Sequence, residues 1–322
     1  MKKRALGSSG IELPELTLGT WLTFSTSNQE LANGLVEAVF DAGINAFDTA
    51  DVYGMGDGER ALAIALSGYP RDSYFLASKV FFPMSDAPED RGLSKKHIFK
   101  SIDNSLSRLN TDYLDLYQCH RFDSDIPLEE TIEAMGVLIS SGKIRAWGTS
   151  VWAPQQLQQA QKVAQALGVP GPVSEQPRYN ILCPEPEREV FPVCEALGLG
   201  VLTWSPLAQG FLTGKYSEQT SQPKASRASH PKPQGVFLQN ALGNPKAFKK
   251  VEALKEIARG IGVSLPALAI AWCLRRREVT TVLIGASGID QLKENLQAVS
   301  VDWSEGLERA ISKVTAGPLL EL

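Results

Sequence analysis

Apolar residues along this chain fall into two alternating patterns. Short, mostly apolar stretches predict buried strands, and the stretches between them carry apolar residues three and four positions apart, which predicts amphipathic helices. The expected strands span residues 16–19, 44–48, 74–79, 113–117, 144–148, 173–175, 200–204 and 281–284. The expected helices of this alternation span residues 30–42, 59–66, 94–109, 128–140, 154–166, 187–197 and 290–298.

Eight strand–helix alternations favour a parallel sheet covered by helices. Over this length a (β/α)8 TIM barrel accommodates eight units better than a doubly wound sheet, so residues 1–322 are expected to form one α/β barrel domain. No Gly-x-Gly-x-x-Gly follows the first strand, which counts against a Rossmann domain. Residues 3–14 alternate around Ser8-Ser9-Gly10 and predict an N-terminal β-hairpin that covers one end of the barrel.

One segment interrupts the alternation. About 75 residues separate the seventh and eighth expected strands, and such a long connection is usually functional or disordered. Residues 210–244 are rich in Ser, Pro, Gly and Lys and predict a long loop after strand seven. Helices are expected near 246–259 and 265–276, with a closing helix near 303–313.

Composition narrows the class of protein. With 43% hydrophobic and 21% charged residues the chain is typical of globular domains, and its net charge of −4 without a basic stripe argues against nucleic acid. No apolar run is long enough for membrane insertion, and the first residues lack the apolar core of a secretory signal. The scattered cysteines indicate free thiols in a reducing cytoplasm, and the three histidines show no metal-ligand spacing.

Polar residues lie where the expected strands end. The strands end in Asp48, Ser78-Lys79, Gln118-Cys119-His120-Arg121, Thr149-Ser150, Glu175-Gln176, Trp204-Ser205-Pro206 and Gly285-Ala286-Ser287. In a (β/α)8 barrel these ends meet at one mouth, where active sites sit. Because an unpaired lysine is costly to bury, Asp48 is the expected partner of Lys79.

One type of reaction suits the residues at this mouth. The phenol of Tyr53, just beyond Asp48, is a poor acid at pH 7, and a nearby Lys79 ammonium would lower its pKa. Asp48 would hold the lysine, and His120 could donate to a carbonyl oxygen. The four could protonate an oxygen as negative charge develops on it. A bound hydride donor fits best as the source of electrons.

Each of these residues also has a simpler explanation. Tyr53 alone suits packing, His120 alone suits a structural histidine, and Arg121 could pair with a nearby acid. Lys79 could instead form a Schiff base, as in a lyase of the aldolase type. Four such residues at one mouth favour the reductive chemistry over these alternatives.

Other residues suit a phosphate-bearing cofactor. Ser287 follows Gly285 at the start of the last barrel helix, where backbone N–H groups bind phosphate, or where they make an ordinary capped surface helix. Further candidates are Gln291, Glu294 and Asn295 along that helix, Trp204, Ser205, Pro206 and Leu207 against an aromatic ring, and Lys215 and Arg227 on the long loop. Loop bases are more often merely solvated.

Several motifs together resemble the aldo-keto reductase superfamily. They are Asp-Thr-Ala-x-x-Tyr-Gly at 48–54, Ser-Lys at 78–79, Gly-Lys-Ile-Arg-x-x-Gly-x-Ser at 142–150, Trp-Ser-Pro-Leu at 204–207 and Ile-Gly-Ala-Ser at 284–287. The resemblance implies a (β/α)8 barrel, bound NADPH, and reduction of aldehydes or ketones.

The resemblance also implies roles. Tyr53 becomes the proton donor, Asp48 and Lys79 its activators, and His120 the group that orients the carbonyl. The implied cofactor contacts are Trp21, Ser150, Gln176, Trp204, Ser205, Pro206, Leu207, Gln209, Gly210, Lys215, Arg227, Gly285, Ser287, Gln291, Glu294 and Asn295. The expected substrate contacts are Trp21, Tyr53, Phe81, His120, Arg121 and Trp152, with Phe24 and Phe82 as further walls.

Within the superfamily the chain is similar to the β-subunits of voltage-gated potassium channels and their bacterial relatives. Gly-Thr-Trp-Leu-Thr-Phe at 19–24 and Ala-Trp-Cys-Leu-Arg at 271–275 carry that similarity. The channel branch has Asn, Arg and Cys where this chain has His120, Val151 and Gln209. With the full catalytic set and no long N-terminal extension, a free-standing reductase is expected rather than a channel-associated redox sensor. The branch forms tetramers, which makes a homo-oligomer an expectation here.

The substrate is expected to be a small carbonyl compound. Apolar walls accept many carbonyls, and Arg121 beside His120 hints at an anionic or polar group. NADPH rather than NADH is expected from Lys215, Arg227 and Ser287.

Overall fold

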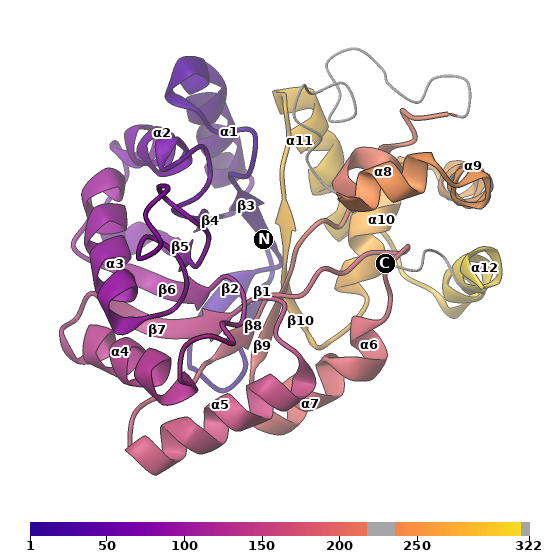
Figure 1. Ribbon diagram of the computed structural model, residues 1–322. Coiled ribbons are helices and arrows are strands. Elements are labelled where there is room, and N and C mark those ends of the chain that lie inside the picture. The colour runs from indigo at the N-terminus through magenta and orange to yellow at the C-terminus, as the bar shows by residue number, and fades with distance from the viewer. Residues whose placement is uncertain (218–235, 317–322) are drawn as a thin grey trace.

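The computed structural model describes residues 1–217 and 236–316 and contains a closed barrel of eight parallel strands surrounded by helices (Figure 1). Around the barrel the strands follow the order β10-β3-β4-β5-β6-β7-β8-β9. The predicted TIM barrel is therefore confirmed. The strands are β3 Leu16–Gly19, β4 Ala46–Asp48, β5 Phe75–Val80, β6 Leu114–Cys119, β7 Ile144–Thr149, β8 Ser174–Glu175, β9 Gly200–Thr203 and β10 Val279–Ile284.

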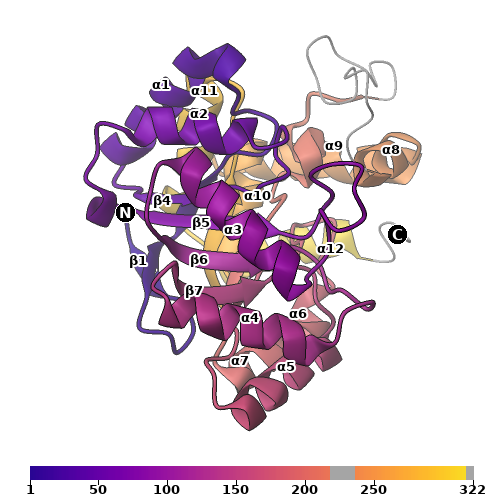
Figure 2. The same cartoon turned by 60° about the vertical axis from the view of Figure 1, so that its left-hand side comes forward.

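Helices form the outer layer, and Figure 2 brings α2, α3 and α4 toward the viewer. The α-helices are α1 Gln29–Asp41, α2 Asp57–Leu66, α3 Lys95–Leu109, α4 Leu128–Ser140, α5 Pro154–Leu167, α6 Pro186–Glu189, α7 Phe191–Leu197, α8 Val236–Leu242, α9 Pro245–Gly260, α10 Leu265–Leu274, α11 Ile289–Leu296 and α12 Glu305–Thr315. Short 3-10 turns are η1 Thr26–Asn28, η2 Arg71–Ser73, η3 Ala208–Thr213 and η5 Gln297–Ser300.

Two predictions about the helices were wrong. The single helix expected over 187–197 is divided into α6 and α7, because Pro192 in the first turn of α7 has no N–H to continue the hydrogen bonds of α6. The loop expected over 210–244 includes part of η3 and all of α8. Leu238 and Ala241 of α8 are buried, so packing rather than local composition determines this helix. Arg227 lies outside the described residues.

The N-terminal hairpin covers the end of the barrel where the strands begin. Its strands, β1 Lys3–Ala5 and β2 Glu12–Pro14, pair antiparallel. Leu6 and Leu13 are fully buried in one cluster with inward residues of the barrel, including Ala46, Ala77 and Leu116. The hairpin therefore closes this end and leaves the opposite, C-terminal end for the polar residues.

The larger core lies between the barrel and its helices. Every residue of α10 is buried in it, which explains a helix that is apolar on all sides. Within the described residues no single helix has the length and composition to cross a membrane. The α9–α10 pair reaches that threshold only jointly, with a bend of 90° between the two helices.

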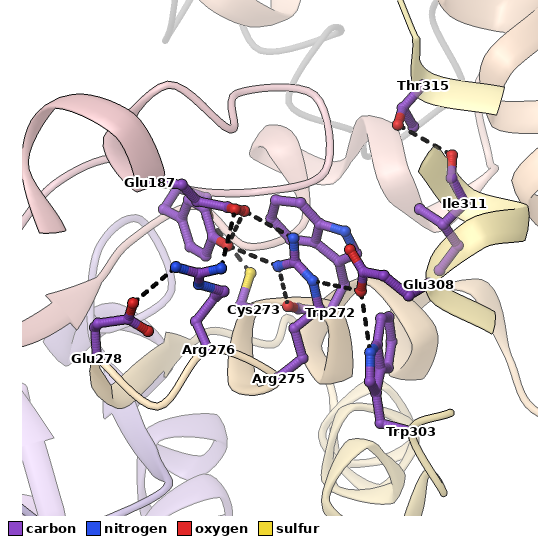
Figure 3. A network of polar contacts seen from close by, with 11 residues as sticks. Glu187, Trp272, Cys273, Arg275, Arg276, Glu278, Trp303, Glu308, Ile311 and Thr315 are labelled. Atoms are coloured by element: carbon purple, nitrogen blue, oxygen red, sulfur yellow. Dashed lines mark hydrogen bonds and ion pairs between the residues drawn. The ribbon is translucent and has the colours of Figure 1, made fainter. Parts of the chain in front are cut away.

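A polar network fastens α10 to its neighbours at the outside of the barrel (Figure 3). The Arg275 guanidinium donates to Glu308 and to Glu187 at 2.8 Å each, and to the Tyr179 hydroxyl at 2.7 Å. It also lies 3.8 Å from the centroid of the Trp272 ring. The network joins α6, α10, α12 and the segment after β8.

Candidate active site

An ion pair between Lys79 and Asp48 forms the base of the mouth. Both side chains are buried, and the Lys79 ammonium donates to one Asp48 oxygen and, at 2.8 Å, to the carbonyl of Thr49. Burial lowers the pKa of Lys79, but the Asp48 carboxylate and the Tyr53 phenol together outweigh burial and hold the pKa above its ordinary value. The predicted pair is confirmed, and its lysine is a fixed positive charge.

Two glutamines hold the other oxygen of Asp48. The amide nitrogens of Gln118 and Gln176 donate to it at 3.1 and 3.0 Å, and Gln176 also donates to Gln118 at 3.1 Å. Gln118 was predicted to lie at a strand end, but no role at the site was predicted for it. Its signal in the sequence is alternation along β6, which turns Leu116 and Gln118 to the same face as each other inside the barrel.

Tyr53 lies on a tight turn after β4. Gly58 backs directly onto this turn, since a Cβ there would lie 3.1 Å from the Tyr53 carbonyl oxygen. Asp51 fastens the turn to α3: its carboxylate accepts the Val52 N–H at 2.7 Å and the Ser101 hydroxyl at 2.8 Å. Burial, with Glu59 nearby, raises the pKa of Asp51 to about 7. Asp51 is a second residue that the site prediction missed.

The Tyr53 ring faces Lys79. The Lys79 ammonium lies 5.2 Å from the ring centroid. The expectation that the pKa of Tyr53 falls was wrong for the net effect, because burial raises it and the opposing contribution of Lys79 is smaller. The phenol therefore keeps its proton at neutral pH, with a cation beside it to stabilise the phenolate that a proton transfer would leave.

His120 lies across from Tyr53. Their ring centroids are 5.9 Å apart with the planes at 74°. Burial, and after it the charges of Lys79 and Arg121, hold the pKa of His120 well below its ordinary value. A neutral imidazole is therefore available to donate a hydrogen bond. Its Nδ1 is buried without a hydrogen-bond partner among the described residues.

Aromatic side chains surround these polar groups. Phe82 meets His120 edge to face at 4.9 Å, Phe81 meets Phe82 at 5.3 Å, and Trp21 lies 6.4 Å from Tyr53. Two aromatic residues that were predicted to line the substrate site lie deeper in the protein. Phe24 is 5% exposed within the core, and Trp152 is 2% exposed with its ring edge against Phe122 at 4.9 Å.

A strained turn follows β7. Val151 has φ = 58°, a left-handed conformation that a β-branched residue rarely adopts. The fully buried carboxylate of Glu175 accepts the N–H groups of Val151 and Trp152 at 2.6 and 3.3 Å and the Thr149 hydroxyl at 2.5 Å. Burial raises the pKa of Glu175 to about 7. Glu175 was predicted to lie at a strand end but without a role, and the structure shows that it holds the turn that carries Ser150 and Trp152.

Left-handed backbone is concentrated at the mouth. Of seven described non-glycine residues with positive φ, the six on loops that follow barrel strands are Leu22, Met55, Val151, Ser205, Ala208 and Gln209. Such conformations cost about 1–3 kcal/mol each and persist where the surrounding structure fixes them, often at functional sites. The buried Gln209 side chain accepts the Leu238 N–H at 3.2 Å, which anchors α8 to this segment.

The remaining predicted cofactor residues line one side of the mouth. The Ser150 hydroxyl donates to the Gln176 carbonyl at 3.0 Å. Gln291 accepts both the N–H and the hydroxyl of Ser287, and the buried Asn295 donates to the Gly285 carbonyl at 3.2 Å. Glu294 is half-buried on α11, while Lys215 is exposed beside Gly210 on η3.

The residues present fit a nicotinamide dinucleotide. The buried Trp204 Nε1 has no hydrogen-bond partner among the described residues, so the ring edge remains available to a ligand acceptor. Ser150 directly follows β7 and Gln176 directly follows β8, and these two strands are neighbours in the barrel. Exposed Ser287, before α11, suits the phosphate end. Among the described residues no cluster of His, Cys, Asp and Glu could hold a metal ion.

A parallel (β/α)8 barrel with a buried Lys–Asp pair, a phenol and an imidazole at its C-terminal mouth is the architecture of a carbonyl-reducing oxidoreductase. Residues 15–312 match the model of the aldo/keto reductase family, and the chain belongs to that family. Membership indicates reduction of carbonyl compounds with a nicotinamide cofactor.

Two curated plant proteins show the branch of the family to which the chain is similar. Both are described as a probable voltage-gated potassium channel subunit beta. The rice protein, from Oryza sativa subsp. japonica, is 39% identical over 94% of this chain and 92% of its own length. The Arabidopsis thaliana protein is 38% identical over the same shares. The predicted resemblance is confirmed at the level of family and branch.

Proposed function

We propose that the protein reduces aldehydes or ketones to alcohols with NADPH. The observation that carries the proposal is the Lys79 ammonium, fixed by Asp48 and facing the Tyr53 ring, with neutral His120 on the other side. NADPH, when bound, supplies a hydride. The chain's own residues then have to bind the carbonyl oxygen and give it a proton.

Tyr53 is the proposed proton donor. Because its phenol stays protonated, it can hydrogen-bond to the carbonyl oxygen and transfer the proton as negative charge develops there. Lys79 stabilises the resulting phenolate, and Asp48 keeps the lysine charged and in place. His120 donates the second hydrogen bond that orients the carbonyl.

The preference for NADPH over NADH is part of the proposal. It is supported by Ser287 before α11 and the exposed Lys215, both able to contact an added phosphate. Arg227, the third residue predicted for this role, lies outside the described residues.

The lyase alternative is less well supported. Schiff-base chemistry needs a neutral, accessible amine, whereas the Lys79 side chain is fully buried, donates to Asp48 and Thr49, and has a raised pKa. The sensor alternative rests on the names of the two plant relatives. A cytoplasmic location, expected from the scattered cysteines, and a homo-oligomer, implied by the resemblance, accompany the proposal.

The test uses cofactor titration by tryptophan fluorescence, followed by NADPH oxidation with 4-nitrobenzaldehyde. Removal of the proton donor in Tyr53→Phe is expected to lower kcat by about 10²–10⁴-fold. The Kd for NADPH should stay within about threefold of wild type, because only a hydroxyl at the reacting end is lost. Tight NADPH binding without turnover across many carbonyls would favour the sensor, and absence of nicotinamide binding would contradict both.

A further inference from the structure

Several half-buried arginines of the described residues form ion pairs with carboxylates. Arg121 at the mouth differs from them. Ion pairs join Arg4 to Glu15 and Arg71 to Asp115 at 2.8 Å, Arg108 to Glu59 at 2.6 Å, and Arg275 to Glu187 at 2.8 Å. This is the expected pattern, because an arginine is costly to remove from water without a partner. Arg121 is likewise half-buried, yet it makes no ion pair with a carboxylate of the described residues.

The contacts of Arg121 leave most of its donors without an acceptor in the part of the chain that the structure describes. Its Nη1 donates to the His120 carbonyl, and its guanidinium lies 5.4 Å from the Phe82 ring centroid. The buried acid whose charge acts on it is Glu175, but that carboxylate is already occupied by Thr149, Val151 and Trp152. Burial has the largest effect on the pKa of Arg121 and lowers it, and the neighbouring charge of Arg178 lowers it as well.

Arg121 also lies beside the reacting groups. Phe82 contacts both the His120 ring and the Arg121 guanidinium, and the charge of Arg121 acts on Tyr53 as well as on His120. A molecule whose carbonyl oxygen meets Tyr53 and His120 would therefore place its neighbouring atoms near the guanidinium. Guanidinium groups bind carboxylate and phosphate with paired, charge-assisted hydrogen bonds.

We propose that Arg121 binds an anionic group of the substrate, so that the preferred substrates are carbonyl compounds that carry a carboxylate or phosphate. This inference rests on the proposed reductase function and refines its substrate class. The anion would supply the charged partner that Arg121 does not have among the described residues. The surrounding aromatic walls would contact the apolar part of such a substrate.

The test compares 4-carboxybenzaldehyde with its uncharged methyl ester, methyl 4-formylbenzoate. Wild-type kcat/KM is expected to favour the acid by about tenfold or more, the size of a charge-assisted hydrogen bond in a partly buried site. Arg121→Met should reduce the acid-to-ester ratio to about one, and Arg121→Lys should leave an intermediate ratio, since lysine keeps the charge but not the paired donors. Arg145→Met, which removes a largely exposed arginine, should leave the ratio unchanged.

Outcomes that overturn the inference are distinct from failure of the proposed function. A wild-type ratio near one, or an equal loss for both aldehydes in Arg121→Met, would contradict the anionic subsite while the reductase stands. If neither aldehyde is turned over, calorimetric binding of 4-carboxybenzyl alcohol still decides the matter. Binding lost in Arg121→Met supports the subsite without the reductase, and binding that is absent or unchanged contradicts it.

Discussion

Two regions of this molecule are centred on an arginine and contain similar residues. They differ in how many of the arginine's hydrogen-bond donors have an acceptor among the described residues. Around Arg275, all three guanidinium nitrogens donate to protein acceptors, namely Glu308, Glu187, the Tyr179 hydroxyl and the Trp272 carbonyl (Figure 3). At the mouth, the acceptor that the described residues offer Arg121 is a single backbone carbonyl, that of His120. The buried His120 Nδ1 and Trp204 Nε1 have no hydrogen-bond partner among the described residues.

The comparison indicates that buried polar groups have two different roles in this protein. A network whose charges are matched stabilises the packing of α6, α10 and α12, and it offers little to a ligand. The mouth keeps donors and charges that the fold itself does not satisfy, at a cost in stability that bound molecules can offset. Substitutions in the Arg275 network should therefore affect stability first, and substitutions at the mouth should affect catalysis first.

The largest expected effect is on turnover, at the base of the mouth. The double variant Asp48→Asn/Lys79→Met removes both charges together and so avoids leaving one buried without its partner. We expect kcat to fall by about 10²–10⁴-fold, because the phenolate of Tyr53 loses its stabilising cation. Steady-state kinetics and urea unfolding on the same preparation check this. A loss of kcat below threefold in folded protein would show that Lys79 has a structural role only.

The next effect is on stability, in the Arg275 network. Arg275→Leu leaves Glu187 and Glu308 without their partner and should lower the free energy of unfolding by about 2–4 kcal/mol. The control is Arg277→Leu, whose arginine is 82% exposed and pairs with an exposed Glu195, and there we expect less than about 1 kcal/mol. Urea titrations measure both. Equal losses in the two variants would contradict the distinction between the regions.

The smallest effect concerns the strained turn after β7. Glu175→Ala should raise the KM for the carbonyl substrate by about three- to tenfold, since Val151 and Trp152 lose their acceptor. Glu175→Gln keeps an acceptor oxygen and should stay within about twofold of wild type.

A glycine substitution at the turn tests whether the effect of Glu175→Ala can be reversed. Val151→Gly in the Glu175→Ala background removes the cost of φ = 58° and should restore part of the KM and part of the melting temperature. Recovery of neither quantity would show that Glu175 does not act through the turn.

Much of the site could be predicted because polar residues stand out at the ends of apolar strands. Asp48 and Lys79 were paired on that basis, and the pairing is confirmed. Gln118 was predicted to lie at a strand end, but its role was not, because a glutamine shows no sign of its partner until the face of the strand is known. Glu175 was also predicted at a strand end, but its role was not, because it accepts backbone N–H groups of a turn in which the left-handed conformation of Val151 runs against the preference of valine.

The fold was predicted where local pattern and packing agree. α4 begins and ends at the expected residues, because Leu128–Ser140 combines apolar periodicity with a stop at Gly142. α8 was missed because seven residues give too short a pattern, and the burial of Leu238 depends on contacts distant in sequence.

The hairpin at the base of the barrel also constrains the order in which the chain can fold. Arg4 donates to the carbonyls of Leu274 and Val279, and Ser8 donates its N–H to Gly198. The hairpin thus obtains all its partners only when β10, the last strand of the barrel in chain order, has left the ribosome. Until then Leu6 and Leu13 lack their final burial, and this floor of the barrel is where chaperones would find apolar surface on the nascent chain.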